Sequence, residues 1–191
     1  MRAAALLLAL LCAAGAARAA DEPLRAGVFE PPREAPAFSL EGSDGAELTL
    51  ARFRGKVIVL AFGFTSCPDV CPVTLATLAK TRKELGDAGR DFQVVYVTVD
   101  PEHDDVKQMH TYLATFDPSF VGGTGSESQL EAVRNAYGIL AQKKMEGTKA
   151  TYGHSSFTYL IDRQGRLRAL MPFGHPSDDY VHDLRILLQQ P

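Results

Sequence analysis

The fold is decided by one stretch of the sequence, KVIVLAFGFTSCPDVCP at residues 56–72. Its first part, KVIVLAF, is a continuous apolar run with β-branched side chains, which is typical of a strand covered on both faces. The segment 73–85 follows with helically spaced leucines, and Gly86 supplies its end. Cys67 and Cys71 are therefore expected in the turn between a buried strand and a helix.

The pattern on both sides of this stretch predicts further strands and helices. Strands are expected at 38–40, 47–50, 92–99, 157–161 and 167–171, with the first two and the last two forming hairpins. Helices are expected at 105–116, 126–137 and 177–190, and a capping box of Ser126 and Gln129 begins the second. Residues 20–36 are proline-rich and predict an extended lead-in. Over residues 37–191 this order predicts an α/β, thioredoxin-like fold, with a central mixed sheet flanked by helices and an added N-terminal β-hairpin.

Composition limits the function classes. The chain has 191 residues, 46% of them apolar, which suits one domain with a full hydrophobic core. Its formal net charge is −3, and it contains neither a basic patch interleaved with aromatic residues nor a glycine loop that could cradle phosphate. Nucleic acid is therefore not an expected partner.

Residues 1–19 are predicted to form a secretory signal peptide. A positive start at Arg2 precedes an apolar run at Ala3–Ala17, and the small residues that follow favour cleavage after Ala19. The alternative is a retained membrane anchor, but the run is shorter than the roughly 20 residues of a spanning helix. We therefore expect an exported, periplasmic protein that is associated with a membrane surface only if this segment is retained.

Cleavage would leave Cys67 and Cys71 as the only cysteines of the mature chain. A disulfide closing so short a loop restricts the unfolded chain very little, so we expect the pair to be kept for its reactivity. A position at a helix N-terminus favours the thiolate and predicts a cysteine pKa below the usual value. Thiolates select soft ions such as Cu(I), and imidazole adds affinity for Cu(II).

Three segments, SCPDVCP (66–72), TVDPEHDD (98–105) and TYGHSSFTYLID (151–162), together resemble the Sco/SenC copper chaperones. The resemblance covers roughly residues 36–188, and it implies a thioredoxin fold on which Cys67, Cys71 and His154 bind copper. It also implies delivery of copper to cytochrome c oxidase subunit II or another copper protein, or reduction of the cysteines of the binuclear copper centre. Other copper chaperones are further candidate partners. This chain has Gly153 where the family usually has an aspartate, and His103 where it commonly has an arginine.

The position of His154 in the sequence also makes it a candidate ligand, independently of the resemblance. It precedes the strand predicted at 157–161, where thioredoxin-like enzymes carry a cis-proline against their redox cysteines, and no proline occurs between Pro118 and Pro172. A histidine in that loop replaces a substrate-docking element with a metal ligand. The alternative is an ordinary hydrogen-bonded loop histidine. Surface, packing or turn roles are favoured for the remaining candidates, which are His103, His110, His175, His182 and Met145.

Two function classes follow. The first is a copper-binding metallochaperone, which is not an enzyme. The second is a thiol–disulfide oxidoreductase in which Cys67 and Cys71 are the catalytic pair and cycle between dithiol and disulfide. The CxxxC spacing and the missing cis-proline weigh against a general oxidoreductase, and a peroxidase of the peroxiredoxin type lacks its threonine, where Phe64 stands.

Overall fold

The computed structural model of the protein describes residues 22–146 and 149–190. The predicted signal peptide, residues 1–19, lies outside the described residues. In the described part, every helix is too short or too polar to cross a bilayer.

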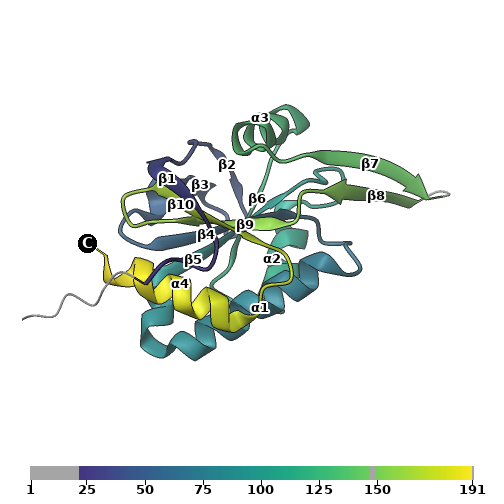
Figure 1. Cartoon of the computed structure of the whole chain (residues 1–191). Helices are drawn as coiled ribbons and strands as arrows, with labels where there is room; N and C mark the ends of the chain where they lie inside the picture. Colours follow the sequence, from purple (N-terminus) through teal and green to yellow (C-terminus); the bar gives the residue numbers. More distant parts are fainter. Residues whose placement is uncertain (1–21, 147–148, 191) are drawn as a thin grey trace, which may run out of the picture.

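A mixed eight-stranded sheet forms the centre of the molecule (Figure 1), in the order β1-β10-β9-β4-β5-β6-β2-β3. Its strands are β1 (Gly27–Glu34), β2 (Leu40–Gly42), β3 (Glu47–Leu48), β4 (Val57–Gly63), β5 (Phe92–Thr98), β6 (Val121–Thr124), β9 (Phe157–Ile161) and β10 (Arg166–Pro172). Strands β4, β5 and β6 run parallel, and β9 pairs antiparallel with β4. Every residue of β4 and β5 is buried, as the continuous apolar runs predict.

Helices cover both faces of this sheet. They are α1 (Val70–Leu85), α2 (Val106–Ala114), α3 (Glu127–Tyr137) and α4 (Ser177–Gln189), with short 3-10 helices η1 (Leu50–Phe53) and η2 (Gly86–Asp91). Figure 1 shows α1 and α4 packed side by side under the sheet and α3 on the opposite side. The predicted capping box of Ser126 and Gln129 is present at the start of α3. This arrangement confirms the predicted thioredoxin-like fold, and β2 and β3 form the added N-terminal hairpin.

The lead-in is more than an extended segment, because it contributes β1 to the sheet. This strand pairs antiparallel with β10 at one edge, where Gly27 lies opposite Leu170. Pro31 and Pro32 lie within β1 and have no N–H to offer, so they limit pairing of the outer edge with another chain.

Two further features differ from the pattern of the sequence. Strand β6 contains Gly122 and Gly123, which have low strand propensity, but a Cβ on either would meet packed side chains within 3 Å. The second is a separate two-stranded sheet of β7 (Ala141–Glu146) and β8 (Lys149–His154), which extends away from the body in Figure 1. Its sequence is largely polar and gives no alternating apolar signal.

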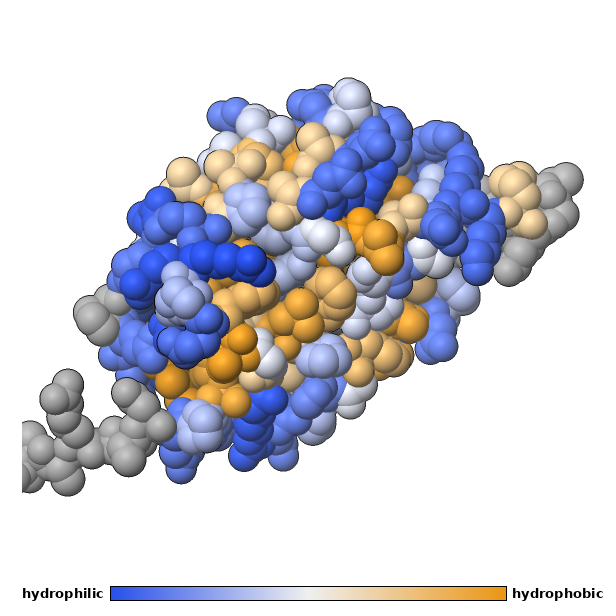
Figure 2. Space-filling model, turned by 45° about the horizontal axis from the view of Figure 1, so that its top comes forward, coloured by the Kyte–Doolittle hydropathy of each residue, from blue (hydrophilic) through white to orange (hydrophobic). Residues whose placement is uncertain are grey.

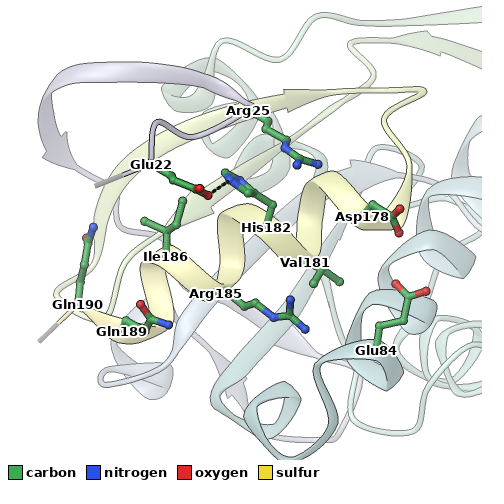
Figure 3. Close-up of a pocket in the computed structure, with 10 residues that line it drawn as sticks. All are labelled: Glu22, Arg25, Glu84, Asp178, Val181, His182, Arg185, Ile186, Gln189 and Gln190. Atoms are coloured by element: carbon green, nitrogen blue, oxygen red, sulfur yellow. Dashed lines mark hydrogen bonds and ion pairs between the residues drawn. The ribbon is translucent and has the colours of Figure 1, made fainter. Parts of the chain in front are cut away.

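The surface seen from the α3 side carries apolar residues across its middle and hydrophilic residues around them (Figure 2). A groove of about 780 Å³ lies between the lead-in and α4. Figure 3 shows charged side chains from both segments around it, including the ion pair of His182 and Glu22 at 3.0 Å. The groove also includes Glu84 near the C-terminal end of α1, whereas Cys71 lies in the first turn of that helix.

Candidate metal centre

The two cysteines lie where β4 passes into α1. Helix α1 begins at Val70, three residues before the predicted start, so Cys71 lies in its first turn. Cys71 is buried and Cys67 is half-buried, and both are free thiols. Cys67 is near enough to act on the Cys71 thiol, whose pKa it raises.

Gly63 at the end of β4 makes room for this arrangement. A Cβ on Gly63 would lie 2.7 Å from the Cys71 Sγ and closer still to the hydroxyl of Tyr96 on β5. Real Cβ atoms do not approach other atoms so closely, so this position requires glycine. The strand end, the sulfur and the phenol therefore converge on one point.

Asp104 fixes the cysteine turn to the loop that follows β5. Its carboxylate is buried and accepts hydrogen bonds from the backbone N–H of Thr65 at 3.0 Å, the Thr65 hydroxyl at 2.6 Å and the Thr98 hydroxyl at 2.5 Å. Burial raises the pKa of Asp104. This anchoring role was not predicted, although Asp104 lies in the TVDPEHDD segment.

His154 is the last residue of β8, and its Nε2 lies 3.7 Å from the Cys71 Sγ. Its Nδ1 lies 2.9 Å from the backbone oxygen of Ser155, an atom that can only accept. Nδ1 therefore carries the proton, and the Nε2 lone pair faces the sulfur. Gly153 offers no carboxylate, and the Ser155 carbonyl orients the ring in its place. Burial lowers the pKa of His154, which favours the neutral form that binds metals.

The expected lowering of a thiol pKa is wrong for Cys71. Burial raises the pKa of this thiol to about 12, although the Tyr96 hydroxyl and a backbone hydrogen bond with Phe64 act in the opposite direction. Removing the charged sulfur from water outweighs the favourable helix terminus. Cys71 therefore keeps its proton at neutral pH until a cation displaces it.

The sheet of β7 and β8, hereafter the histidine hairpin, is attached to the body by side chains. Lys143 on β7 pairs with Glu102 at 2.6 Å, and the Tyr152 hydroxyl on β8 donates to Asp100 at 3.3 Å. The Tyr152 and His154 rings both pack on Phe64, with centroid distances of 5.5 and 6.0 Å. These contacts hold His154 over the cysteine turn.

The donor set fits a soft metal ion but is not a closed site. Among the described residues, no three Cys, His, Asp or Glu side chains already form a metal-ligand cluster. The structure brings His154 to Cys71, and Cys67 lies in the turn that leads into the helix of Cys71. A cavity of about 20 Å³ is lined by Cys71, His154 and Tyr96, which is room for about one water-sized particle. Two thiols and one neutral imidazole suit copper.

His103, His175 and His182 lie against carboxylates. His103 Nδ1 is 2.9 Å from Asp100, and His175 Nδ1 is 2.8 Å from Asp179. The pairing with Asp100 raises the pKa of the exposed His103. Met145 is exposed on the histidine hairpin. These contacts agree with the structural roles favoured from the sequence.

Known proteins are similar to this chain in sequence and in fold. A family model described as SCO1/SenC matches residues 28–189. The chain is 37% identical over 126 residues to the Arabidopsis thaliana "Protein SCO1 homolog 1, mitochondrial", covering 65% of this chain and 38% of that protein. It is 35% identical over 132 residues to the "SCO2-like protein RP587" of Rickettsia prowazekii, covering 68% and 64%. The match thus spans less than two thirds of either relative.

Solved structures of the same kind superpose on this chain. Arabidopsis thaliana ScoI with copper bound has a TM-score of 0.76 and 31% identity, covering 82% of this chain and 99% of that one. Apo Sco1 from Thermus thermophilus has a TM-score of 0.78 and 33% identity, covering 88% and 99%. BsSco, described with a disulfide switch and as a member of the Sco family of cytochrome c oxidase assembly proteins, has a TM-score of 0.69 and 25% identity, covering 86% and 99%. By the family match and these superpositions, the chain belongs to the SCO1/SenC family.

Proposed function

We propose that this protein is an exported copper metallochaperone that serves the assembly of cytochrome c oxidase. The observation that carries the proposal is the approach of His154 Nε2 to within 3.7 Å of the Cys71 Sγ, with Cys67 in the turn that leads into the same helix. Related proteins with the same fold have been solved with copper bound. Copper is the cargo, and Cys67, Cys71 and His154 are its proposed ligands.

Loading exchanges protons for copper. The bound ion displaces the proton of Cys71, whose pKa is about 12, and accepts the lone pair of a neutral His154. Uptake therefore releases protons and weakens as the pH falls. The half-buried Cys67 is the more accessible of the two sulfurs, so we propose that a recipient's ligands replace it first.

The recipient we propose is the binuclear copper centre of cytochrome c oxidase subunit II. This target rests on the family resemblance and on the assembly role stated for BsSco. Another copper protein that receives the ion, or a second copper chaperone that supplies it, would also exchange copper through the more accessible Cys67.

A second candidate function is reduction of the recipient's cysteines. It is favoured by the placement of both thiols at one strand–helix junction and by the disulfide switch described for BsSco. In this exchange Cys67 and Cys71 form a disulfide and give up two electrons and two protons, while a disulfide of the recipient becomes two thiols. The two functions share the same cysteines but differ in their need for His154.

We propose that the protein acts outside the cytoplasm. The predicted signal peptide at residues 1–19 supports export, and retention of that segment would place the domain at a membrane surface. One solved relative is described as a SCO1/SenC family lipoprotein from Bacillus anthracis, at 25% identity. Fractionation of cells that express the chain tests this placement, because a cytoplasmic pool of unprocessed protein would contradict it.

Copper titration of the reduced protein tests the proposed function. We expect one copper ion per chain, a loss of about 100-fold or more in affinity in Cys67→Ser and Cys71→Ser, and a changed Cu(II) spectrum in His154→Ala. His175→Ala is the matched control, because that side chain contacts Asp179 and not the cysteines. An unchanged Cu(II) affinity and spectrum in His154→Ala would show that the ligand assignment is wrong. Disulfide reductase activity that is insensitive to His154→Ala would favour the second candidate.

A further inference from the structure

The phenol of Tyr96 lies at the candidate metal centre, although Tyr96 is not one of the proposed copper ligands. The residue lies on β5 opposite Ala61 of β4, and only 1% of its surface is exposed. Its hydroxyl and the Cys71 Sγ converge on the space beside Gly63. Each of these two groups also changes the pKa of the other, as close neighbours do. Tyr96 therefore places its hydroxyl beside the buried sulfur, on the side of the sheet.

The hydrogen bond from the Tyr96 hydroxyl to the protein backbone is weak. The hydroxyl donates to the backbone oxygen of Phe64 at 3.4 Å, which is at the long limit for an O–H donor. That oxygen already accepts from the backbone N–H of Cys67 at 3.3 Å. A hydroxyl proton rotates about its C–O bond, so it can turn from a weak acceptor to a stronger one nearby.

Copper loading would create a stronger acceptor. A neutral thiol accepts hydrogen bonds weakly, whereas a sulfur that has lost its proton to a metal carries negative charge and accepts a charge-assisted bond. Burial raises the pKa of Tyr96 well above its usual value, so the phenol retains the proton that it donates. In a buried place such a bond is not weakened by competition from water.

We infer that the Tyr96 hydroxyl donates a hydrogen bond to the Cys71 sulfur in the copper-loaded protein, and that this bond strengthens copper binding and tunes the copper–sulfur bond. Tyr96 is thus a positioning residue, since it acts on copper through Cys71. The inference rests on the proposed function, namely that copper is bound through Cys67, Cys71 and His154.

Tyr96→Phe tests this role because it removes one oxygen and keeps the ring. We expect Cu(I) affinity, measured by competition with a chelator, to fall about tenfold, the lower end of what a hydrogen bond to a charged acceptor contributes. We also expect the sulfur-to-Cu(II) charge-transfer band to move to lower energy, since the sulfur electrons lose the stabilising proton. Tyr137→Phe is the matched control: it loses a 2.7 Å hydrogen bond to the Pro36 carbonyl and should leave both quantities unchanged.

The outcomes separate the inference from the proposed function. If the wild type shows no copper–sulfur band, the proposed function fails. If the wild type shows the band and Tyr96→Phe binds copper with the same affinity and the same band, the role of Tyr96 is overturned and the proposed function stands. Should Tyr96→Phe fail to fold, 3-fluorotyrosine at position 96 keeps the shape and makes a stronger donor. A band that moves to higher energy then supports the role, and an unmoved band overturns it.

Discussion

The cysteine turn and the histidine hairpin supply the two halves of the candidate centre, and they are held in different ways. The turn joins a fully buried strand to a helix and is fixed by the buried carboxylate of Asp104. The hairpin is a separate two-stranded sheet, attached through Lys143, Tyr152 and ring contacts. A two-stranded sheet has little stability of its own. We infer that the sulfurs are set by the core of the protein, whereas the position of the imidazole depends on a few surface contacts.

Gly63→Ala should destabilise the cysteine turn more than any other substitution proposed below. The added Cβ would press against the Cys71 sulfur and the Tyr96 hydroxyl, both of which are buried. Overpacking of this kind costs about 1–3 kcal/mol, and we expect the upper end because the crowding atoms belong to packed groups. Urea unfolding measures the loss, and copper titration should show weaker binding.

Gly153→Ala provides the matched change in the histidine hairpin. The nearest atoms to its added Cβ are the Cε and Nζ of Lys144 at 3.8 Å, an ordinary contact. We expect stability to change by less than about 0.5 kcal/mol. Equal losses of stability in Gly63→Ala and Gly153→Ala would contradict the view that the core fixes the cysteine turn (the fixed half) while a few surface contacts hold the histidine hairpin (the attached half).

Asp104→Ala should have the next largest effect. It leaves the N–H and hydroxyl of Thr65 and the hydroxyl of Thr98 without their acceptor, and we expect a loss of about 2 kcal/mol. Because the pKa of Asp104 is raised in the folded state, its stabilising contribution is largest below the unfolded pKa of about 4 and falls as the pH rises through the folded pKa. The difference in unfolding free energy between wild type and variant should therefore shrink from pH 4 to pH 7. A difference that grows from pH 4 to pH 7 would show that the pKa of Asp104 is lowered, not raised, in the folded state.

Tyr152→Phe tests the attachment of the histidine hairpin. The change removes the hydroxyl that donates to Asp100 at 3.3 Å and keeps the ring on Phe64. A single neutral-donor hydrogen bond contributes about 0.5–1.5 kcal/mol, so we expect Cu(II) affinity to fall about threefold. The unfolding free energy of the domain should stay almost constant. A large loss of stability with unchanged copper affinity would place Tyr152 in the core and not in the attachment.

Glu102→Gln should have the smallest effect. It removes the ion pair with Lys143, in which both side chains are substantially exposed, and exposed pairs contribute about 0–1 kcal/mol. We expect less than a twofold change in Cu(II) affinity at physiological salt and a clearer one at low salt, because ions screen the pair. Glu84→Gln, which removes the distant pair with Lys80, is the control and should leave copper affinity unchanged at every salt concentration.

The sequence predicts the fixed half far better than the attached half. The apolar run of β4 and the leucines of α1 specify a strand–turn–helix unit, so the place of Cys67 and Cys71 follows from local patterns. The histidine hairpin has a largely polar sequence and is exposed at Met145, so periodicity gives no sign of it. The position of His154 in place of a cis-proline made it a candidate ligand, with an ordinary loop histidine as the alternative, and the family resemblance favoured the ligand.

Burial accounts for what the motif chemistry missed at the site. A helix N-terminus favours a thiolate, but the depth of Cys71 in the packed structure reverses the direction of its pKa shift. The depth of a side chain depends on distant strands and cannot be obtained from neighbouring residues. The same reason applies to Asp104, whose partner Thr65 lies in the cysteine turn, 39 residues away in the sequence.

X-ray absorption at the copper edge tests the joining of the two halves most directly, applied to the loaded wild type and to His154→Ala. In the wild type we expect a first shell of two sulfur atoms and one imidazole nitrogen, and in His154→Ala we expect the two sulfur atoms to remain while the imidazole signal is lost. A copper shell without sulfur, or an imidazole signal that persists in His154→Ala, would contradict a centre built from Cys67, Cys71 and His154.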